Sequence, residues 1–414
     1  MEKFRKLGLI EPILNSLQEQ NFKEPSEIQE KSIPPILEGR DVIAGAATGS
    51  GKTLAFAAGI IKNSERGKGI QAIVLTPTRE LAEQVSISLQ RFSRDKQLNI
   101  ISVYGGVSII PQIRELTSAD VVVATPGRML DHINRRTIRL DNVKILVLDE
   151  ADRMLDMGFQ RDVGKIISYC PLKRQTLLFS ATISDEVSRL ARRYMNNPIK
   201  ISAQSYVDSS KLVQFYCSVR DNEKISLLVH FLKNEKADLV MVFCNTQRKT
   251  EFVSHHLKKL GIDSLSIHGG YSQNQRSRAM HHFTSGRITV LVCTDIAARG
   301  LDIKGISHIY NYDMPADNTD YIHRIGRTAR AGSEGKVMNL IGSNDYENFD
   351  NILRDKSLDI KEVETPKIEI VEVKSEREHY GNNRGSYGSG HSNSGRGYNS
   401  RRDNRHSGRN FRRR

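Results

Sequence analysis

The stretch that decides the fold is Val143-Lys144-Ile145-Leu146-Val147-Leu148-Asp149-Glu150-Ala151-Asp152. Its first six positions are almost all apolar, which is typical of a strand buried on both faces of a parallel sheet. Such a strand delivers Asp149 and Glu150 to its carboxyl end. Open α/β sheets bind their ligands at that edge. The sequence therefore predicts an α/β fold with two carboxylates at a ligand-binding edge.

Upstream, the apolar run 41–45 leads into a loop of small residues and then into a helix-like stretch. The loop reads Ala46, Ala47, Thr48, Gly49, Ser50, Gly51, Lys52 and Thr53. Small residues let backbone N–H groups approach phosphate oxygens, and a helix N-terminus favours negative charge. Lys52 can reach the β- and γ-phosphates, and the Thr53 hydroxyl can ligate Mg²⁺. Ala46 replaces the first glycine of the general pattern, but the strand–loop–helix context favours nucleotide binding over an ordinary glycine turn.

The two features together predict a site for ATP and Mg²⁺. Asp149 suits the magnesium carboxylate, held through water, and Glu150 is then free to orient and deprotonate the attacking water. The alternative is a solvated acidic strand end. Phosphoryl transfer also needs cations near the γ-phosphate. Arg327 and Arg330 in the second half are three residues apart, hence on one face if the stretch is helical, and would act as arginine fingers. A solvated basic helix face is the alternative.

Composition limits the class of protein. The 414 residues allow two or three domains, and no apolar run is long enough to span a bilayer. The first residues lack the pattern of a signal peptide. The cysteines, Cys170, Cys217, Cys244 and Cys293, are far apart and form no metal-binding pair. We therefore expect a cytoplasmic protein with no contact to a membrane.

Apolar strand-like runs alternate with helix-like segments in two series, which predicts βαβ units and parallel sheets. The first series of strands is 41–45, 70–75, 99–104, 120–124, 143–148 and 175–180. The second is 212–219, 238–244, 262–267, 288–294, 307–312 and 336–341. We expect two α/β domains, 1–204 and 212–360, joined by a linker at 205–211.

The C-terminal part changes composition. Residues 361–378 mix four basic with six acidic side chains, which predicts a connector. Residues 379–414 contain nine arginines, no lysine and one aspartate, a net charge of +8 within a total of +14. Without aliphatic residues this segment is expected to be disordered. Interspersed aromatic rings and guanidinium groups can stack on unpaired bases, so RNA binding is favoured over a merely solubilising tail.

Taken together, residues 4 to 341 resemble a DEAD-box RNA helicase, through about a dozen motifs in the expected order. The resemblance implies two tandem RecA-like parallel-sheet domains, and a minimal bacterial or archaeal, RhlE-like type. It implies RNA-stimulated ATP hydrolysis coupled to local, non-processive unwinding of short RNA duplexes or to remodelling of RNA–protein complexes. Ribosome assembly, RNA decay and cold adaptation are candidate settings, with ribosomal or RNA-decay proteins as candidate partners of a monomer.

The segment 22–29 resembles the adenine-reading motif of the family. By resemblance, Gln29 hydrogen-bonds the adenine edge, and Phe22 and Phe4 pack near the base. Asn21 stands where the family usually has glycine, and Ser26 where it usually has threonine.

Other matching motifs imply contacts to RNA. In the first half they contain Pro77, Thr78, Arg79, Gly105, Gly106, Thr125 and Arg128. In the second half they contain Thr246, Gly269, Gln273, Arg276, Thr294, Arg299 and Gly300. Asp302 is expected at the ribose of ATP. Asp152, Ser180, Thr182 and His323 match the residues that couple hydrolysis to strand separation.

The implied mechanism is a clamp in which ATP and RNA together bring Arg327 and Arg330 to the γ-phosphate. The clamp favours a bent single strand of RNA, with little sequence preference. A DNA helicase or translocase of the wider superfamily is one alternative, which strand displacement on matched RNA and DNA duplexes would separate. The other is an RNA chaperone in which hydrolysis is incidental.

Overall fold

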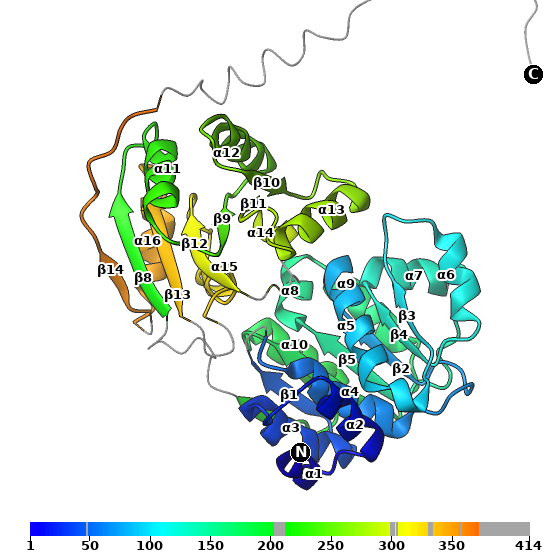
Figure 1. The fold of residues 1–414 in the computed structure, drawn as a ribbon. Coiled ribbons are helices and arrows are strands. Elements are labelled where there is room, and N and C mark those ends of the chain that lie inside the picture. The colour runs from blue at the N-terminus through cyan, green and yellow to red at the C-terminus, as the bar shows by residue number, and fades with distance from the viewer. Residues whose placement is uncertain are drawn as a thin grey trace, which may run out of the picture. The chain divides into compact units, whose positions relative to one another are not determined.

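The computed structural model describes residues 1–46, 49–202, 212–298, 303, 305–329, 334–356 and 358–371. They belong to one compact unit, Met1–Glu372. In it, strands and helices alternate in two series, as the sequence predicts (Figure 1). The predicted linker at 205–211 and the tail at 379–414 lie outside the described residues.

The first series forms a seven-stranded parallel sheet with the order β3-β4-β2-β5-β6-β1-β7. Its strands are β1 (Val42–Gly45), β2 (Ala72–Leu75), β3 (Ile100–Val103), β4 (Val121–Ala124), β5 (Ile145–Asp149), β6 (Gln175–Ser180) and β7 (Ile199–Ser202). All residues of β5 are buried, as the apolar run predicts. In register, Leu148 pairs with Leu75 on one side and with Leu178 on the other, so the end of β5 lies in the middle of the sheet.

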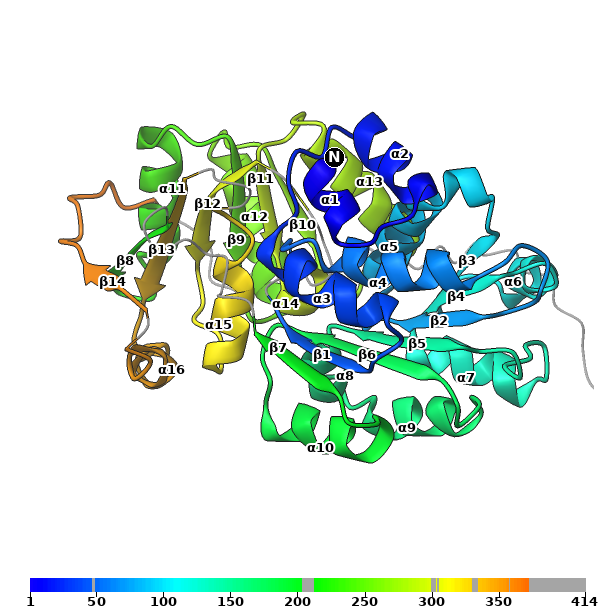
Figure 2. The same cartoon turned by 90° about the horizontal axis from the view of Figure 1, so that it is seen from below.

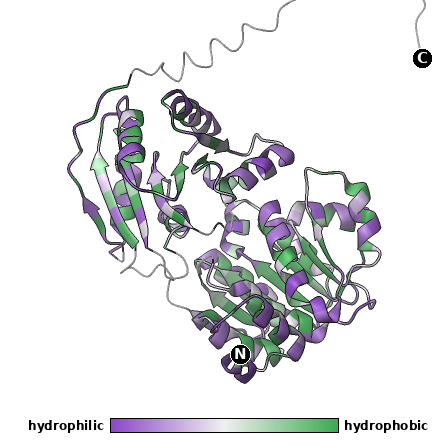
Figure 3. Cartoon of the chain, viewed as in Figure 1, coloured by the Kyte–Doolittle hydropathy of each residue, from purple (hydrophilic) through white to green (hydrophobic). Residues whose placement is uncertain are grey.

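Helices cover both faces of this sheet (Figure 2). They are α1 (Glu2–Lys6), α2 (Glu11–Glu19), α3 (Glu27–Leu37), α4 (Lys52–Asn63), α5 (Arg79–Phe92), α6 (Ile109–Leu116), α7 (Pro126–Asn134), α8 (Ala151–Asp156), α9 (Gln160–Ser168) and α10 (Asp185–Tyr194), with the short 3₁₀ helix η1 (Arg94–Lys96). Helices α1 to α5 contribute to one apolar core, and α6 to α10 to the other. The apolar strands lie between more polar helix surfaces (Figure 3). Burial of these two faces is the main favourable term in folding.

The second series forms another seven-stranded parallel sheet, with the order β10-β11-β9-β12-β13-β8-β14. Its strands are β8 (Leu212–Ser218), β9 (Leu239–Phe243), β10 (Ser264–Ile267), β11 (Val290–Cys293), β12 (Ile306–Asn311), β13 (Gly335–Ile341) and β14 (Ile360–Glu362). Its helices are α11 (Lys224–Asn234), α12 (Gln247–Lys259), α13 (Gln273–Thr284), α14 (Asp295–Ala298), α15 (Asn318–Ile325) and α16 (Tyr346–Leu353). Counted in chain order within each half, both sheets follow the same sequence of strands.

Two strands, β7 and β14, were not predicted. Each lies at the edge of its sheet, pairs with the first strand of that half, and has mostly exposed or half-exposed side chains. Strand β14 reaches two residues into the predicted connector. Beyond it, the Thr365 hydroxyl donates to the carbonyl of Ser218 at 2.7 Å, and the Val371 amide donates to the Ser226 hydroxyl at 3.0 Å. The start of the connector therefore packs along the second sheet.

All four cysteines are buried and free. Burial raises the pKa values of the Cys170 and Cys217 thiols to about 11, so both remain protonated near neutral pH. Among the described residues, no helix is both long and apolar enough to cross a membrane.

Candidate active site and nucleic-acid interface

The predicted phosphate lysine lies at the first position of α4, directly after the small-residue loop. Lys52 is 6% exposed, and its Nζ atom has no hydrogen-bond partner within the described residues. The buried Ser50 hydroxyl also has no hydrogen-bond partner among the described residues. Gly51 precedes the helix with φ 93°, a left-handed conformation that suits glycine. A buried, unsatisfied ammonium group at a helix N-terminus fits the binding of phosphate oxygens.

Gln29 packs directly against this loop. Its Nε2 donates to the Gly51 carbonyl at 3.1 Å, and its Oε1 accepts from the Ser26 amide at 3.0 Å. The Ser26 hydroxyl donates to the Ser50 carbonyl at 2.7 Å, so serine supplies the same hydroxyl as the usual threonine. A Cβ atom on Gly51 would lie 2.3 Å from Gln29 Nε2. This segment therefore holds the phosphate loop, and the contact of Gln29 with adenine stays a prediction.

The two predicted aromatic residues differ in exposure. Phe4 is fully buried and meets the half-buried Phe22 edge to face, with ring centroids 6.5 Å apart. Phe4 therefore supports Phe22 and has no free face for a base. Asn21 has φ 57°, the left-handed region where asparagine is the best-tolerated substitute for glycine.

Asp149 ends β5 with its carboxylate buried. Its Oδ1 accepts from the Glu150 amide at 3.1 Å. Burial raises the pKa of Asp149 to about 6, an effect that Lys52 opposes and Glu150 increases. Such a carboxylate is stabilised by a nearby cation. The described residues hold no cluster of three or more acidic, His or Cys side chains for a metal. One carboxylate and the hydroxyl of Thr53, with water and phosphate oxygens, fit Mg²⁺, which is usually bound this way.

Glu150 follows in a left-handed conformation, φ 54° and ψ 52°, which turns the chain from β5 into α8. It is 3% exposed, and its Oε2 atom lies 3.5 Å from Nη1 of Arg153. Burial favours the neutral acid, but Arg153, Lys52 and Arg327 outweigh it and lower the pKa of Glu150. The surrounding cations therefore favour the ionised form of Glu150, which is the form that a general base requires.

Arg153 was missed by sequence reasoning. It is 1% exposed, and Nε, Nη1 and Nη2 have no hydrogen-bond partner within the described residues. Its 3.5 Å approach to Glu150 is an ion pair without a hydrogen bond. Its spacing of three from Glu150, on the helix that begins there, is the signal that could have found it.

Asp152 is the centre of the predicted coupling group. Its Oδ2 accepts from the Thr182 amide at 2.8 Å and from the Thr182 hydroxyl at 3.1 Å. The Ser180 hydroxyl accepts from the Asp152 amide at 3.2 Å. His323 Nε2 lies 3.8 Å from Oδ2, an approach from the second sheet. Burial favours the neutral acid, but His323 and the Thr182 amide outweigh it and lower the pKa of Asp152. The structure brings all four predicted coupling residues together.

Arg327 and Arg330 would share a helix face only if the stretch around them were helical. The described part of that stretch, residues 323–329, does not form one continuous helix, so this expectation is corrected. Helix α15 ends at Ile325, and the amide of Arg327 donates to the carbonyl of Arg324 in the following turn. Gly326 is the C-cap of α15, with φ −65° and ψ 4°. Ala329 has φ 54°, in the left-handed region that favours glycine. Arg327 is nonetheless close enough to lower the pKa of Glu150.

Arg324 has a structural role in the second half. Its Nε and Nη2 donate to the two oxygens of Asp295, each at 2.7 Å, and Nη2 also reaches the Asn245 side chain at 2.8 Å. A fully buried, bidentate guanidinium of this kind fixes geometry. Arg324 thereby ties the start of α14 and the segment before α12 to α15.

Most of the predicted RNA contacts of the first half lie around one cleft of about 400 Å³. Its lining includes Pro77, Thr78, Arg79, Gly105, Thr125, Arg128 and Arg276. Gly106 lies beside it with φ 79°, and a Cβ atom there would collide with the guanidinium of Arg79. Glycine at position 106 thus leaves room for the guanidinium of Arg79. Arg276 of α13 lies 3.1 Å from Glu80 of α5, a mostly buried ion pair that closes one end.

Of the other predicted RNA residues of the second half, the four that the structure describes do not line this cleft. Thr246 uses its hydroxyl to cap α12, accepting from the Lys249 amide at 3.1 Å. Thr294 is buried and precedes α14. Gln273 begins α13, and its buried Oε1 has no hydrogen-bond partner within the described ranges. Gly269 has the amide of Gln247 as its neighbour. Six predicted site residues lie outside the described residues: Ala47, Thr48, Arg299, Gly300, Asp302 and Arg330.

Comparison with known proteins agrees with this geometry. The family model of DEAD/DEAH box helicases matches residues 26–190, and that of the helicase conserved C-terminal domain matches residues 223–332. The ATP-dependent RNA helicase CshA of Listeria monocytogenes is 46% identical over 82% of this chain and 66% of its own length. CshA of Limosilactobacillus reuteri is 43% identical over 83% of this chain and 70% of its own length.

Solved structures share the fold. Dbp5 of S. cerevisiae bound to RNA and ADP BeF3 is 30% identical, with a TM-score of 0.80 over 88% of this chain and 96% of that one. A DEAD box protein of Methanococcus jannaschii is 41% identical, with a TM-score of 0.54 over 87% of this chain and 99% of that one. Both halves are RecA-like domains in tandem, as predicted. The chain belongs to the DEAD-box family of ATP-dependent RNA helicases.

Proposed function

We propose that this chain hydrolyses ATP in an RNA-dependent cycle and uses that cycle to open short RNA duplexes locally. One observation carries the proposal. Glu150 lies in the combined field of Lys52 and Arg153 from the first sheet and of Arg327 from the second. A site that needs a residue from each sheet is complete only when the two are together, which gives RNA a means of controlling hydrolysis.

In this mechanism, Lys52 and the loop amides bind the phosphates of ATP. Asp149, through water, and the Thr53 hydroxyl would hold Mg²⁺, which when bound would neutralise charge on the phosphate oxygens. Glu150 orients the attacking water and accepts its proton. Arg327, with Arg330, neutralises the charge that develops on the γ-phosphate. Asp152 holds the segment of Ser180 and Thr182 by hydrogen bonds. Through His323 of α15, it couples the state of the ATP site to the second half of the chain.

RNA is proposed to lie along the cleft with its backbone against Arg79, Arg128 and the cleft amides. Contacts to phosphates and 2′-hydroxyls favour RNA over DNA with little dependence on sequence. The similarity to Dbp5 bound to RNA supports this placement. If matched RNA and DNA duplexes were displaced equally well, a DNA helicase would be the better assignment.

The tail, residues 379–414, is proposed to add affinity for RNA through its nine arginines. Its removal should flatten the salt dependence of RNA binding, by roughly 0.7 in logarithmic slope for each phosphate that the tail neutralises. An unchanged slope would assign the tail another task. A cytoplasmic site of action, a monomeric state and partners from ribosome assembly or RNA decay remain predictions. The RhlE-like subtype does too, because the two relatives above carry the name CshA.

The experiment that tests the function is Glu150→Gln. The substitution keeps the shape and removes the base, so RNA-stimulated turnover should fall by about 10²–10⁴-fold. ATP-dependent retention of RNA should persist, because the phosphate and RNA contacts remain. A variant that turns over ATP like the parent would remove Glu150 from the mechanism. Loss of turnover without retained RNA binding would favour a general folding defect.

A further inference from the structure

A second groove lies on the first half of the chain, between α9 and α10. Its volume is about 740 Å³. Four exposed cations line it: Arg161, Lys165, Arg189 and Arg193. None of the residues described as lining it is a carboxylate. The predicted ATP and RNA contacts make no use of this groove.

The cations stand in two rows. Arg161 and Lys165 are four residues apart on α9, and Arg189 and Arg193 are four apart on α10. Residues with this spacing share a helix face, with Cβ atoms about 5–6 Å apart. Leu190 of α10 is buried at the groove, which fixes the direction of that face. The result is a channel with positive charge on both walls.

Gly164 determines how the walls meet. A Cβ atom at Gly164 would lie 2.5 Å from the hydroxyl oxygen of Tyr194, so only glycine lets the tyrosine of α10 approach α9 this closely. The guanidinium of Arg193 lies 5.3 Å from the centre of the Tyr194 ring. The groove floor is thus a half-buried aromatic ring beside a cation, a pair that also suits nucleobases.

One acid partly offsets the charge. Glu186 lies 3.6 Å from Arg189, and both side chains are more than half exposed. Exposed pairs of this kind contribute little and are readily exchanged. The groove therefore keeps a net positive charge that attracts a polyanion.

Along the chain, the groove begins where the lining of the cleft described above ends. Met157 and Phe159 line the cleft, and the next residues, Gln160 and Arg161, line the groove. A strand that leaves the cleft past Phe159 therefore meets Arg161 first and Lys165 one turn later. We propose that the α9–α10 groove is an accessory RNA site that binds the phosphates of nucleic acid extending beyond the cleft. This inference rests on the proposed function, since it takes RNA as the ligand of the cleft.

The test compares two double variants of the full chain with the same change in charge. Lys165→Gln/Arg193→Gln alters the groove, and Lys68→Gln/Arg91→Gln alters exposed cations elsewhere in the first half. The affinity of each variant is measured for two RNAs. The short RNA is just long enough to stimulate the ATPase of the parent fully, and the longer RNA extends it at both ends. Thermal unfolding confirms that both variants are folded.

The groove variant should lose the extra affinity for the longer RNA, and its salt slope should fall by about 1.4, or 0.7 for each of two phosphates. Its half-saturating concentration of long RNA should rise while maximal turnover is unchanged, and Lys165→Glu should show the same loss. The control variant should match the parent. Two results would overturn the proposal: equal losses of affinity for the longer RNA in both variants, or no loss in the groove variant. No loss in the groove variant would favour an acidic protein as the partner of the groove. Normal stimulation by the short RNA would leave the proposed function standing, whereas no stimulation by either RNA in the parent would contradict that function itself.

Discussion

In each half of the chain, the helix that follows the first strand begins with a lysine, and the two lysines differ in what they contact. Lys52 starts α4 after β1, and Lys224 starts α11 after β8. Both are buried, at 6% and 3% exposure. The Nζ atom of Lys52 has no hydrogen-bond partner among the described residues. That of Lys224 donates to the Asp345 carboxylate and to the carbonyl of Tyr312, the latter at 2.9 Å.

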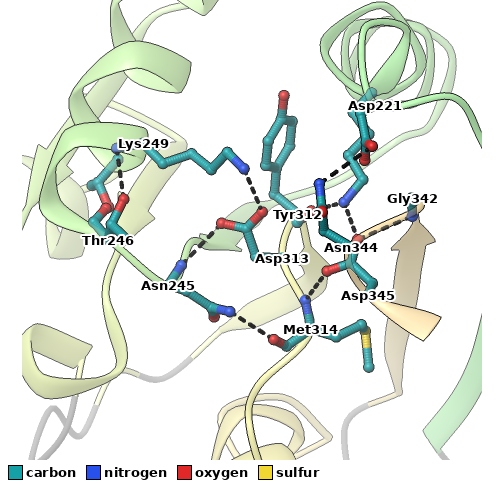
Figure 4. A network of polar contacts seen from close by, with 12 residues as sticks. Asp221, Asn245, Thr246, Lys249, Tyr312, Asp313, Met314, Gly342, Asn344 and Asp345 are labelled. Carbon is teal, nitrogen blue, oxygen red and sulfur yellow. Dashed lines mark hydrogen bonds and ion pairs between the residues drawn. The ribbon is translucent and has the colours of Figure 1, made fainter. Parts of the chain in front are cut away.

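Asp345, which pairs with Lys224, belongs to a network that also engages the backbone (Figure 4). Asp345 accepts from the amides of Met314 and Gly342, at 2.9 and 3.0 Å. A Cβ atom on Gly342 would lie 2.6 Å from Cε of Lys224, so the space is filled. The comparison teaches that one fold supports two uses of the same position. The second half satisfies its lysine with internal partners, whereas the lysine of the first half has no hydrogen-bond partner among the described residues, as expected of a group that binds a ligand.

Arg327→Gln should have the largest effect on turnover, because we propose that this residue of the second half acts at the ATP site of the first half. We expect RNA-stimulated ATP turnover to fall by about 10³-fold or more. Steady-state hydrolysis measures it, with the exposed Lys259→Gln as a control of equal charge. Turnover within about threefold of the parent would mean that Arg327 is not a catalytic cation.

Lys224→Met should destabilise the second half while leaving the ATP site unchanged. Removal of one partner strands the buried Asp345 carboxylate, which costs about 3–5 kcal/mol. Urea unfolding measures the loss. The double variant Lys224→Met/Asp345→Asn should recover part of it, because no buried charge is left unpaired. An unfolding free energy equal to that of the parent would show that Lys224 is not held as described.

Arg153→Gln should shift the pH dependence of turnover. Arg153 lowers the pKa of Glu150, so its removal raises that pKa and moves the acid limb of the turnover profile to higher pH. Loss of turnover at every pH with an unmoved limb would assign Arg153 a purely structural role.

The fold could be predicted from the sequence because its central strands are continuous apolar runs, as in 143–148. The two edge strands could not be predicted in this way. In β7 and β14, most side chains face solvent, so no apolar pattern marks them, and only pairing with β1 and β8 defines them. Tertiary context decides such strands.

The site shows the same division. Lys52, Asp149 and Glu150 follow from strand ends and loop chemistry, which are local in sequence. Arg153 does not follow in this way, because no local pattern in the sequence indicates that a charged residue on α8 is fully buried. The end of α15 before Arg327 was also missed, since a glycine inside a polar helical pattern is compatible with either outcome.

The central claim, that only the first lysine serves a nucleotide, is tested most directly by calorimetric titration of the chain with a non-hydrolysable ATP analogue, Mg²⁺ and saturating RNA. We predict one nucleotide per chain and, for Lys52→Ala, a loss of about 10–100-fold in affinity, as for a charge-assisted contact of 1.5–3 kcal/mol. Two nucleotides per chain, or undiminished binding by Lys52→Ala, would contradict the account.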